Sequence, residues 1–197
     1  LTYGNPAYGR GNGFVRIDVP LTRDLDVVNE ALFGLSTRGG DEYVARVISH
    51  ALESLTWSQD ARALRTMFVA GNESATQDPI LRLDVVGARA NERGVVVNTI
   101  FCGDAAAGAR GGWEAAARLA GGLYASIDQN AAAVANVATP YDDQLKALNA
   151  ELNQTYLPYG ADGAERLRNQ ARQDANAGQM SAASAASRVV TKSSSVY

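Results

Sequence analysis

Cysteine and histidine, two side chains that enzymes often use as nucleophile and general base, each occur once in this 197-residue chain. The single histidine, His50, excludes every site that needs two, and the single cysteine, Cys102, excludes an internal disulfide and any multi-cysteine metal site. Cys102 ends an apolar run, where a lone cysteine is more often a small hydrophobe than a nucleophile. Ser54 and Ser126 lack a nucleophile-elbow motif. We therefore predict that the protein is not an enzyme.

The glycine-rich segment Gly9–Gly13 resembles a loop that cradles phosphate. A dinucleotide-binding loop must open a helix, whose N-terminus then holds the phosphate. Here the glycines lead instead into Phe14–Val19, where apolar and charged side chains alternate as they do in a half-exposed strand. We therefore favour a hairpin turn, with Leu1–Tyr3 and Phe14–Val19 pairing antiparallel across it.

Composition narrows the class of protein and its partners. Hydrophobic residues make up 46% of the chain and charged residues 20%, which is the balance of a soluble globular protein. The net charge of −3 gives no reason to expect nucleic acid or an anionic membrane as a partner. No apolar run approaches the roughly 20 residues that a membrane span needs. Because the sequence opens with Leu1 in an apparent strand end, we expect it to be part of a longer protein.

Short apolar runs alternate with helical patterns over residues 1–128. The runs Met67–Ala70, Val95–Cys102 and Leu123–Ile127 are expected to be strands, and the first, short and wholly apolar, is typical of a strand buried on both faces. Between and before them lie helix-spaced apolar residues, including a helix capped by Thr22 and a second one after Gly39-Gly40. This order predicts an α/β domain with a doubly wound, mostly parallel sheet and one antiparallel edge hairpin.

Residues 129–197 form a separate, alanine-rich helical extension in this interpretation. Tyr141, Leu145, Leu148, Leu152 and Tyr156 make one amphipathic stripe, which Leu157-Pro158-Tyr159-Gly160 ends. A second helix through residues 164–175 offers mostly methyl groups and buries little area by itself. We expect these two helices to pair, with the first carrying most of the contact.

Several segments in order resemble bacterial von Willebrand factor A-type (VWA-type) domains over residues 1–128. The matching segments are Leu21–Asp26, Thr37–Glu42, Met67–Glu73, Gly94–Gly103 and Ala117–Tyr124. The resemblance implies a protein-binding module with a metal-ion-dependent adhesion site at the carboxyl-end edge of the sheet. It also implies that the first strand and helix of the fold, with the family's Asp-x-Ser-x-Ser loop, lie upstream of Leu1.

The family pattern implies a ligand set for Mg²⁺ or Ca²⁺ made of Asp41, Glu42, Asn72 and Glu73. Glu42 lies nearest the family's threonine position, and Asn72 stands where the family usually has aspartate. Both cations accept oxygen ligands of these kinds. The alternative is that the four are loop and helix-cap residues, because acids at a helix N-terminus need no metal.

Two functions from different classes remain open at the level of sequence. In the first, the loops after the buried strands hold a partner protein, with or without a bridging cation. In the second, the chain has a structural or assembly role, in which the helices after residue 130 pack against a neighbour, including a second copy of the chain, and the ion site is vestigial. The resemblance favours a bacterial periplasmic or secreted location over a cytoplasmic one.

Overall fold

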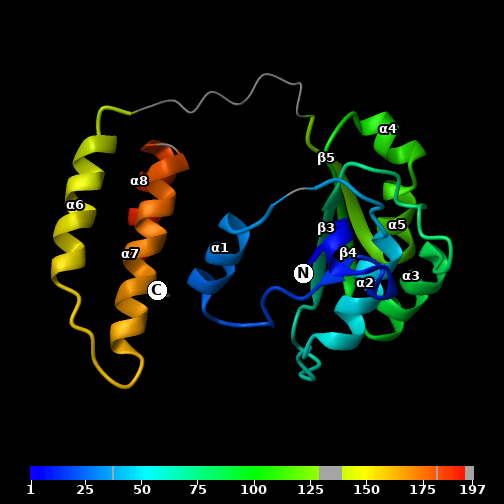
Figure 1. Ribbon diagram of the computed structural model, residues 1–197, viewed down its shortest axis with the longest axis horizontal. Helices are drawn as coiled ribbons and strands as arrows, with labels where there is room; N and C mark the ends of the chain where they lie inside the picture. Colours follow the sequence, from blue (N-terminus) through cyan, green and yellow to red (C-terminus); the bar gives the residue numbers. More distant parts are fainter. Residues whose placement is uncertain (37, 129–138, 181, 194–197) are drawn as a thin grey trace. The chain divides into compact units, whose positions relative to one another are not determined.

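The chain divides into two compact units in the computed structural model, which describes residues 1–36, 38–128, 139–180 and 182–193. The first unit contains Leu1–Thr22 and Ser36–Ala133, and the second contains Arg23–Leu35 and Val134–Tyr197. The first unit holds all the strands of the described residues, and the second holds helices (Figure 1). The predicted boundary between residues 128 and 129 falls at the start of residues 129–138, which lie outside the described residues.

A three-stranded parallel sheet forms the centre of the first unit. Its strands are β3 (Thr66–Gly71), β4 (Val96–Phe101) and β5 (Gly121–Ser126), in the order β3-β4-β5. Both pairs of neighbouring strands are parallel, which confirms the predicted arrangement. Apolar and β-branched residues favour strands at β3 and β4, whereas β5 starts with two glycines and has no β-branched residue.

A short antiparallel pair stands beside this sheet as a sheet of its own. Strand β1 (Thr2–Tyr3) pairs with β2 (Val15–Arg16), as predicted, although both strands are shorter than expected. The segment between them makes two single 3-10 turns and ends at Gly13, whose φ of 63° lies in the left-handed region that glycine adopts without strain. The glycine-rich segment is therefore a hairpin connection, as predicted.

In the described residues, the α-helices of the first unit are α2 (Val44–Ser54), α3 (Leu83–Glu92), α4 (Ala105–Arg110) and α5 (Trp113–Leu119). Helices α3 and α5 pack against β4, and α2 packs on α3, so these helices gather on one side of the strands (Figure 1). Helix α4 lies in the segment between β4 and α5, where the sequence patterns predicted no helix. Asp104 caps α4 by accepting a hydrogen bond from the Ala107 N–H, and the alanines that follow favour a helix.

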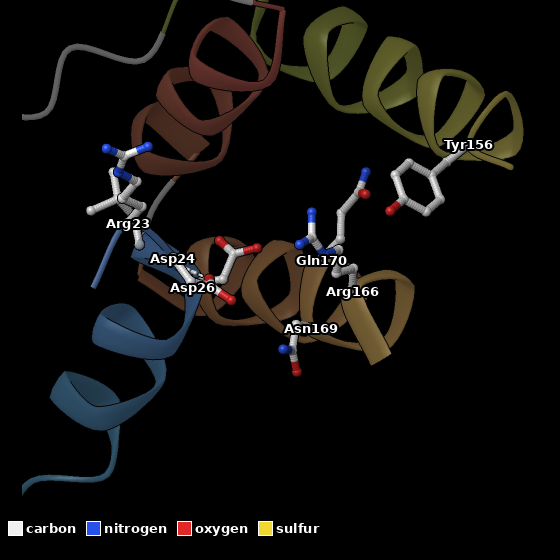
Figure 2. A pocket seen from close by; sticks show the side chains of 8 residues that line it. Arg23, Asp24, Asp26, Tyr156, Arg166, Asn169 and Gln170 are labelled. Atoms are coloured by element: carbon white, nitrogen blue, oxygen red, sulfur yellow. Dashed lines mark hydrogen bonds between the residues drawn. The ribbon is translucent and has the colours of Figure 1, made fainter. Parts of the chain in front are cut away.

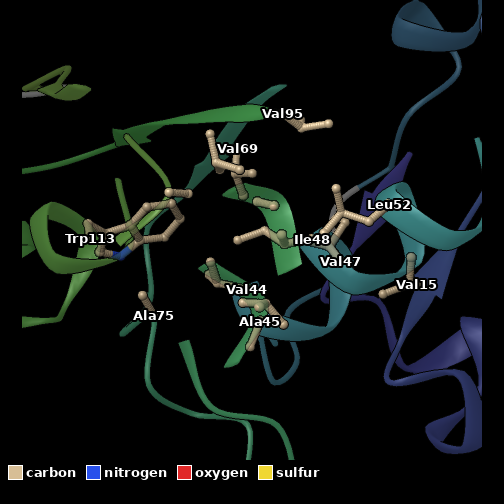
Figure 3. Packing of buried hydrophobic residues seen from close by; sticks show 14 of the residues in the cluster. Val15, Val44, Ala45, Val47, Ile48, Leu52, Val69, Ala75, Val95 and Trp113 are labelled. Carbon is tan, nitrogen blue, oxygen red and sulfur yellow. The ribbon is translucent and has the colours of Figure 1, made fainter. Parts of the chain in front are cut away.

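The core of the first unit lies between these helices and one face of the sheet (Figure 3). Trp113 is fully buried and packs at a tilt on Phe101, with ring centroids 5.9 Å apart. From α2, Ile48 and Leu52 are buried in the same cluster, which confirms the apolar face expected for this helix. The buried Thr99 hydroxyl donates to the Trp113 carbonyl at 2.9 Å, so this hydroxyl has a hydrogen-bond partner inside the core.

The opposite face of the sheet carries exposed side chains. Along each strand side chains alternate between faces, so Val69 and Val97 are buried while Phe68 is 65% exposed. Leu123 of β5 is 79% exposed. Parallel sheets usually have both faces covered by helices. Helices on both faces, as a doubly wound fold requires, therefore stay a prediction for this chain.

The second unit contains α1 (Leu25–Phe33), α6 (Asp142–Gln154), α7 (Gly163–Met180) and α8 (Ala182–Lys192). The predicted cap at Thr22 is wrong: Asp24 is the N-cap, and its carboxylate accepts hydrogen bonds from the N–H groups of Asp26 and Val27. Helix α8, which the sequence patterns did not reveal, packs against both α6 and α7, while α1 packs on α7. The prediction that α6 and α7 pack mainly on each other is therefore wrong: α8 lies against both, and α6 reaches α7 through hydrogen bonds from Asn149 and Asn153 to Asp174.

A polar network joins α6, α7 and α8. The Lys192 ammonium, whose side chain is only 1% exposed, donates to Asp174 at 2.8 Å and to Asn149 at 2.7 Å. The Nε of Arg188 lies 3.1 Å from the same aspartate. Burial alone would raise the pKa of Asp174, but hydrogen bonds from Lys192 and Asn153 lower it. Charged hydrogen bonds, rather than leucines alone, thus hold these helices in register.

Candidate functional site

Glu42 lies at the carboxyl-end edge of the parallel sheet and is held there by the backbone that follows β3. Its Oε2 accepts hydrogen bonds from the N–H groups of Asn72 and Glu73, each at 3.2 Å. The geometry arises because Glu42 comes just before α2, which packs beside the sheet, and because β3 ends at Gly71. The structure therefore brings three of the four sequence-predicted residues together.

Gly71 is the residue that makes this close approach feasible. A Cβ atom on Gly71 would stand 2.6 Å from Glu42 Oε2, 2.6 Å from the Tyr3 hydroxyl and 2.8 Å from the Trp113 ring. Contacts this short would force at least one of the three side chains to move. The glycine that ends β3 thus lets a carboxylate, a phenol and an indole share one crowded corner of the sheet.

Tyr3 is a member of this site that sequence reasoning did not single out. Its hydroxyl donates to the Ala70 carbonyl at 2.7 Å. Burial raises the pKa of Tyr3 strongly, and the nearby Glu42 and Cys102 raise it further. The phenol is therefore neutral at ordinary pH and acts as a hydrogen-bond donor. Nothing in the sequence around Tyr3 signals this role, because it depends on β1 lying near β3.

The remaining predicted ligands have hydrogen-bond partners within the chain. Asp41 accepts a bond from the Tyr43 hydroxyl at 3.0 Å, and Glu73 accepts one from the Gln77 amide at 3.2 Å. Gln77 in turn accepts a bond from the Glu42 N–H at 2.9 Å. In the described part of the chain, no group of three or more His, Cys, Asp or Glu side chains is placed to hold a metal ion. A cation at Asp41, Glu42, Asn72 and Glu73 stays a prediction.

A buried ion pair anchors the loop that carries Asn72 and Glu73. Asp78 of this loop receives two hydrogen bonds from Arg46 of α2, at 2.9 and 3.0 Å, and its side chain is 1% exposed. The backbone N–H groups of Ile80 and Leu81 also donate to Asp78. Burial alone would raise the pKa of Asp78, but these hydrogen bonds and the Arg46 charge outweigh it and lower that pKa. The loop is therefore held at its start by Glu42, just before α2, and near its end by Arg46 of α2.

The end of β4 lies next to this corner. The Cys102 N–H donates to the Gly71 carbonyl at 2.7 Å, and the Cys102 thiol is free and half-buried. Across the described residues, no hydrogen bond joins His50 to Cys102 or to Ser126. What the carboxyl-end edge offers is a set of oriented carboxylates, amides and backbone groups, which suits recognition of another molecule's polar groups.

A cavity of about 390 Å³ opens in the second unit, and none of the sequence-predicted site residues lines it. Figure 2 shows Asp24 and Asp26 of the α1 end on one side and Arg166, Gln170 and Tyr156 on the other. Asp24 caps α1, and Asp26 forms an ion pair with Arg188 of α8 at 3.1 Å, so both acids have structural roles within the helical unit. The cavity lining also includes Arg23, Leu25 and Asn169.

Comparison with protein-family models, with curated proteins and with solved structures gave no match to this chain. The VWA-type resemblance thus depends on the sequence segments themselves. Among the helices of the described residues, none combines the length and the apolar composition that crossing a membrane requires.

Proposed function

We propose that the first unit is a VWA-type module that binds a partner protein through the loops at the carboxyl-end edge of its parallel sheet. The observation that carries the proposal is the geometry of Glu42. Its carboxylate bonds to two backbone N–H groups after β3 and holds that loop, with the exposed Asn72 and Glu73, at the sheet edge. In open parallel sheets, ligands bind at this edge, where the loops after neighbouring strands meet.

The hairpin of β1 and β2 also supports the VWA-type proposal, because the resemblance implies an antiparallel edge hairpin followed by parallel strands. The Tyr3 hydroxyl joins this hairpin to the end of β3 by donating to the Ala70 carbonyl.

A cation is an optional part of this proposal. Mg²⁺ or Ca²⁺ would meet Asp41, Glu42, Asn72 and Glu73, where one oxygen of Glu42, Oε2, already accepts from two backbone N–H groups. The loop contacts are complete without an ion, so we propose that partner recognition by this chain does not need one.

Site-specific photo-crosslinking tests where the partner binds. A photoreactive benzoylphenylalanine replaces Asn72 at the carboxyl-end edge or, as the matched control, the exposed Arg62 before the amino end of β3. Each variant is irradiated in an extract of the source cells and the adducts are resolved by mass. We expect a discrete adduct from position 72 and none of that mass from position 62. The same adduct from both positions, or none from position 72, would reject the proposed surface.

The second unit favours an assembly role as the other candidate function. On α6, Leu148 is 47% and Leu152 38% exposed, although both belong to the apolar stripe of that helix. Exposed leucines in a row are typical of a surface that packs on another chain. Light scattering of the wild type and of Leu148→Asp tests this role. A dimer that becomes a monomer on substitution supports assembly, and a wild-type monomer contradicts it.

A further inference from the structure

The cavity of about 390 Å³ in the helical unit has one wall made of polar side chains. Arg166, Asn169 and Gln170 of α7 line it, and their spacing of three and four residues places them on one face of that helix. A helix face that is turned towards neighbouring helices is usually apolar. The cavity volume lies within the range of about 300–1,000 Å³ that is typical of small-molecule sites. Packing between helices alone does not explain this polar wall.

Gln170 brings an unpaired hydrogen-bond acceptor to the cavity. Its side chain is 5% exposed, and its Nε2 donates to Asn153 of α6 at 2.9 Å. Among the described residues, no donor reaches the Gln170 carbonyl oxygen. A buried amide oxygen without a partner costs free energy, so native proteins pair such atoms with protein, water or ligand. Because Gln170 also lines the cavity, a donor group of a bound molecule can reach its side chain.

Two guanidinium groups bring positive charge to the same cavity. Arg23 and Arg166 both line it and are exposed, and neither has an ion pair or a side-chain hydrogen bond within the described part of the chain. The two acids of the lining are already engaged, because Asp24 caps α1 and Asp26 pairs with Arg188. Guanidinium groups bind carboxylates through paired, charge-assisted hydrogen bonds. The unpaired charge at the cavity therefore favours an anion.

Leu25 and Tyr156 give the cavity an apolar part. Leu25 is the first residue of α1, and Tyr156 follows the end of α6 at Gln154. Figure 2 shows the Tyr156 hydroxyl turned towards Gln170 and Arg166. A ligand that reaches these polar groups therefore also meets an aromatic ring, as is usual in small-molecule sites, where apolar surface surrounds a few polar groups.

We propose that this cavity binds a small organic carboxylate that also carries a hydroxyl group. The carboxylate pairs with Arg166, the hydroxyl donates to the Gln170 carbonyl oxygen, and the carbon skeleton packs on the Tyr156 ring. The donor is a hydroxyl rather than an ammonium, because both acids of the lining have partners and the unpaired charge is positive. The site belongs to the helical unit, so this proposal and that of the sheet-edge surface fail independently.

Calorimetric titration of the full chain with phenyllactate and three controls tests the chemistry of the ligand. Phenylpropionate lacks the hydroxyl, phenylpropanediol lacks the carboxylate, and inorganic phosphate lacks the carbon skeleton. We expect phenyllactate to bind and each control to bind about tenfold more weakly or worse, because each lacks one recognised group. No binding of phenyllactate at millimolar concentration, or equal binding of any control, overturns the proposal.

A matched pair of substitutions on α7 locates the bound anion. Arg166→Gln removes a positive charge from the cavity wall, while Arg168→Gln removes one from an exposed position of the same helix that does not line the cavity. We expect phenyllactate binding to weaken about tenfold in the first variant and to change less than about twofold in the second. Both native side chains are exposed, so both variants should keep the wild-type melting temperature. Equal weakening would show a general attraction of anions to the helix and overturn the proposal.

Gln170→Met tests the acceptor by a ratio of two affinities. The substitution removes the carbonyl oxygen at similar side-chain size, so the variant should no longer prefer phenyllactate over phenylpropionate. A partial loss of folded protein would reduce both bindings equally and leave their ratio unchanged. A preference for phenyllactate as large as that of the wild type would overturn the proposed contact between the hydroxyl and Gln170.

Discussion

Replacing Asp78 with Asn should destabilise the first unit by removing one charge of its most buried ion pair. The substitution leaves the Arg46 guanidinium, 17% exposed, facing a neutral amide in which an NH2 group, unable to accept, replaces one of the two carboxylate oxygens that now accept from it. Breaking a fully buried pair costs about 3–5 kcal/mol. Because Arg46 retains some contact with water, we expect a loss of about 2–3 kcal/mol in the free energy of unfolding. The loop with Asn72 and Glu73 should loosen along with it.

Urea denaturation followed by tryptophan fluorescence measures this effect, because Trp113 is buried in the same unit. The matched control is Asp60→Asn, which removes a carboxylate from an exposed pair with Arg62 and should leave the urea midpoint unchanged. The pKa of folded Asp78 lies below the unfolded value of about 3.9. Its contribution is therefore complete above that value and is lost as pH falls through the lower folded pKa. Equal midpoints for wild type and Asp78→Asn at pH 7 would refute the reasoning.

Three further predictions concern packing, the helical unit and the cation. Gly122→Ala should lower the free energy of unfolding by about 3 kcal/mol or more, because the added Cβ would lie 2.0 Å from the Val97 carbonyl oxygen of β4. In the control Gly11→Ala the added Cβ meets no atom within 4 Å, so the melting temperature should change little. Lys192→Met should lower the free energy of unfolding of the helical unit by about 2 kcal/mol, because Asp174 keeps its ion pair with Arg188 but loses the buried ammonium of Lys192. A melting curve, followed by helical circular dichroism, that is the same for the variant and the wild type would contradict this. Calorimetry should show no tight binding of Mg²⁺ or Ca²⁺, and micromolar affinity that is lost in Asp41→Ala would prove the prediction wrong.

The parallel sheet could be predicted because its signals are local. Met67–Ala70 and Val95–Cys102 are apolar runs of strand length, each preceded by a helix-spaced stripe, and both became neighbouring strands. Helix α4 was missed because its alanines and glycines carry no apolar periodicity, and the cap at Asp104 was its one sequence signal. Helix α8 was missed for a similar reason: what places it is a buried lysine contacting two other helices, which no local pattern shows.

The site was predictable in its residues but not in its contacts. The sequence segments pointed to Glu42, Asn72 and Glu73, and the structure does bring them to one edge. That a carboxylate would bond to backbone N–H groups depends on the exact end of β3 at Gly71, which is a matter of tertiary packing. Tyr3 joins the site from the far end of the first unit's sequence, so its role could only come from the fold.

Competition against the position-72 cross-link tests the central claim most directly. The adduct formed by the benzoylphenylalanine at position 72 is quantified in the presence of a tenfold excess of a competing chain without the photoreactive group. The competitor is the wild-type chain in one reaction and the Asn72→Arg variant, which changes an exposed side chain of the loop, in the other. If the carboxyl-end loops bind the partner, the wild-type chain should reduce the adduct about tenfold and Asn72→Arg should reduce it much less. Equal competition by both chains, or none by either, would contradict a specific binding surface at this edge.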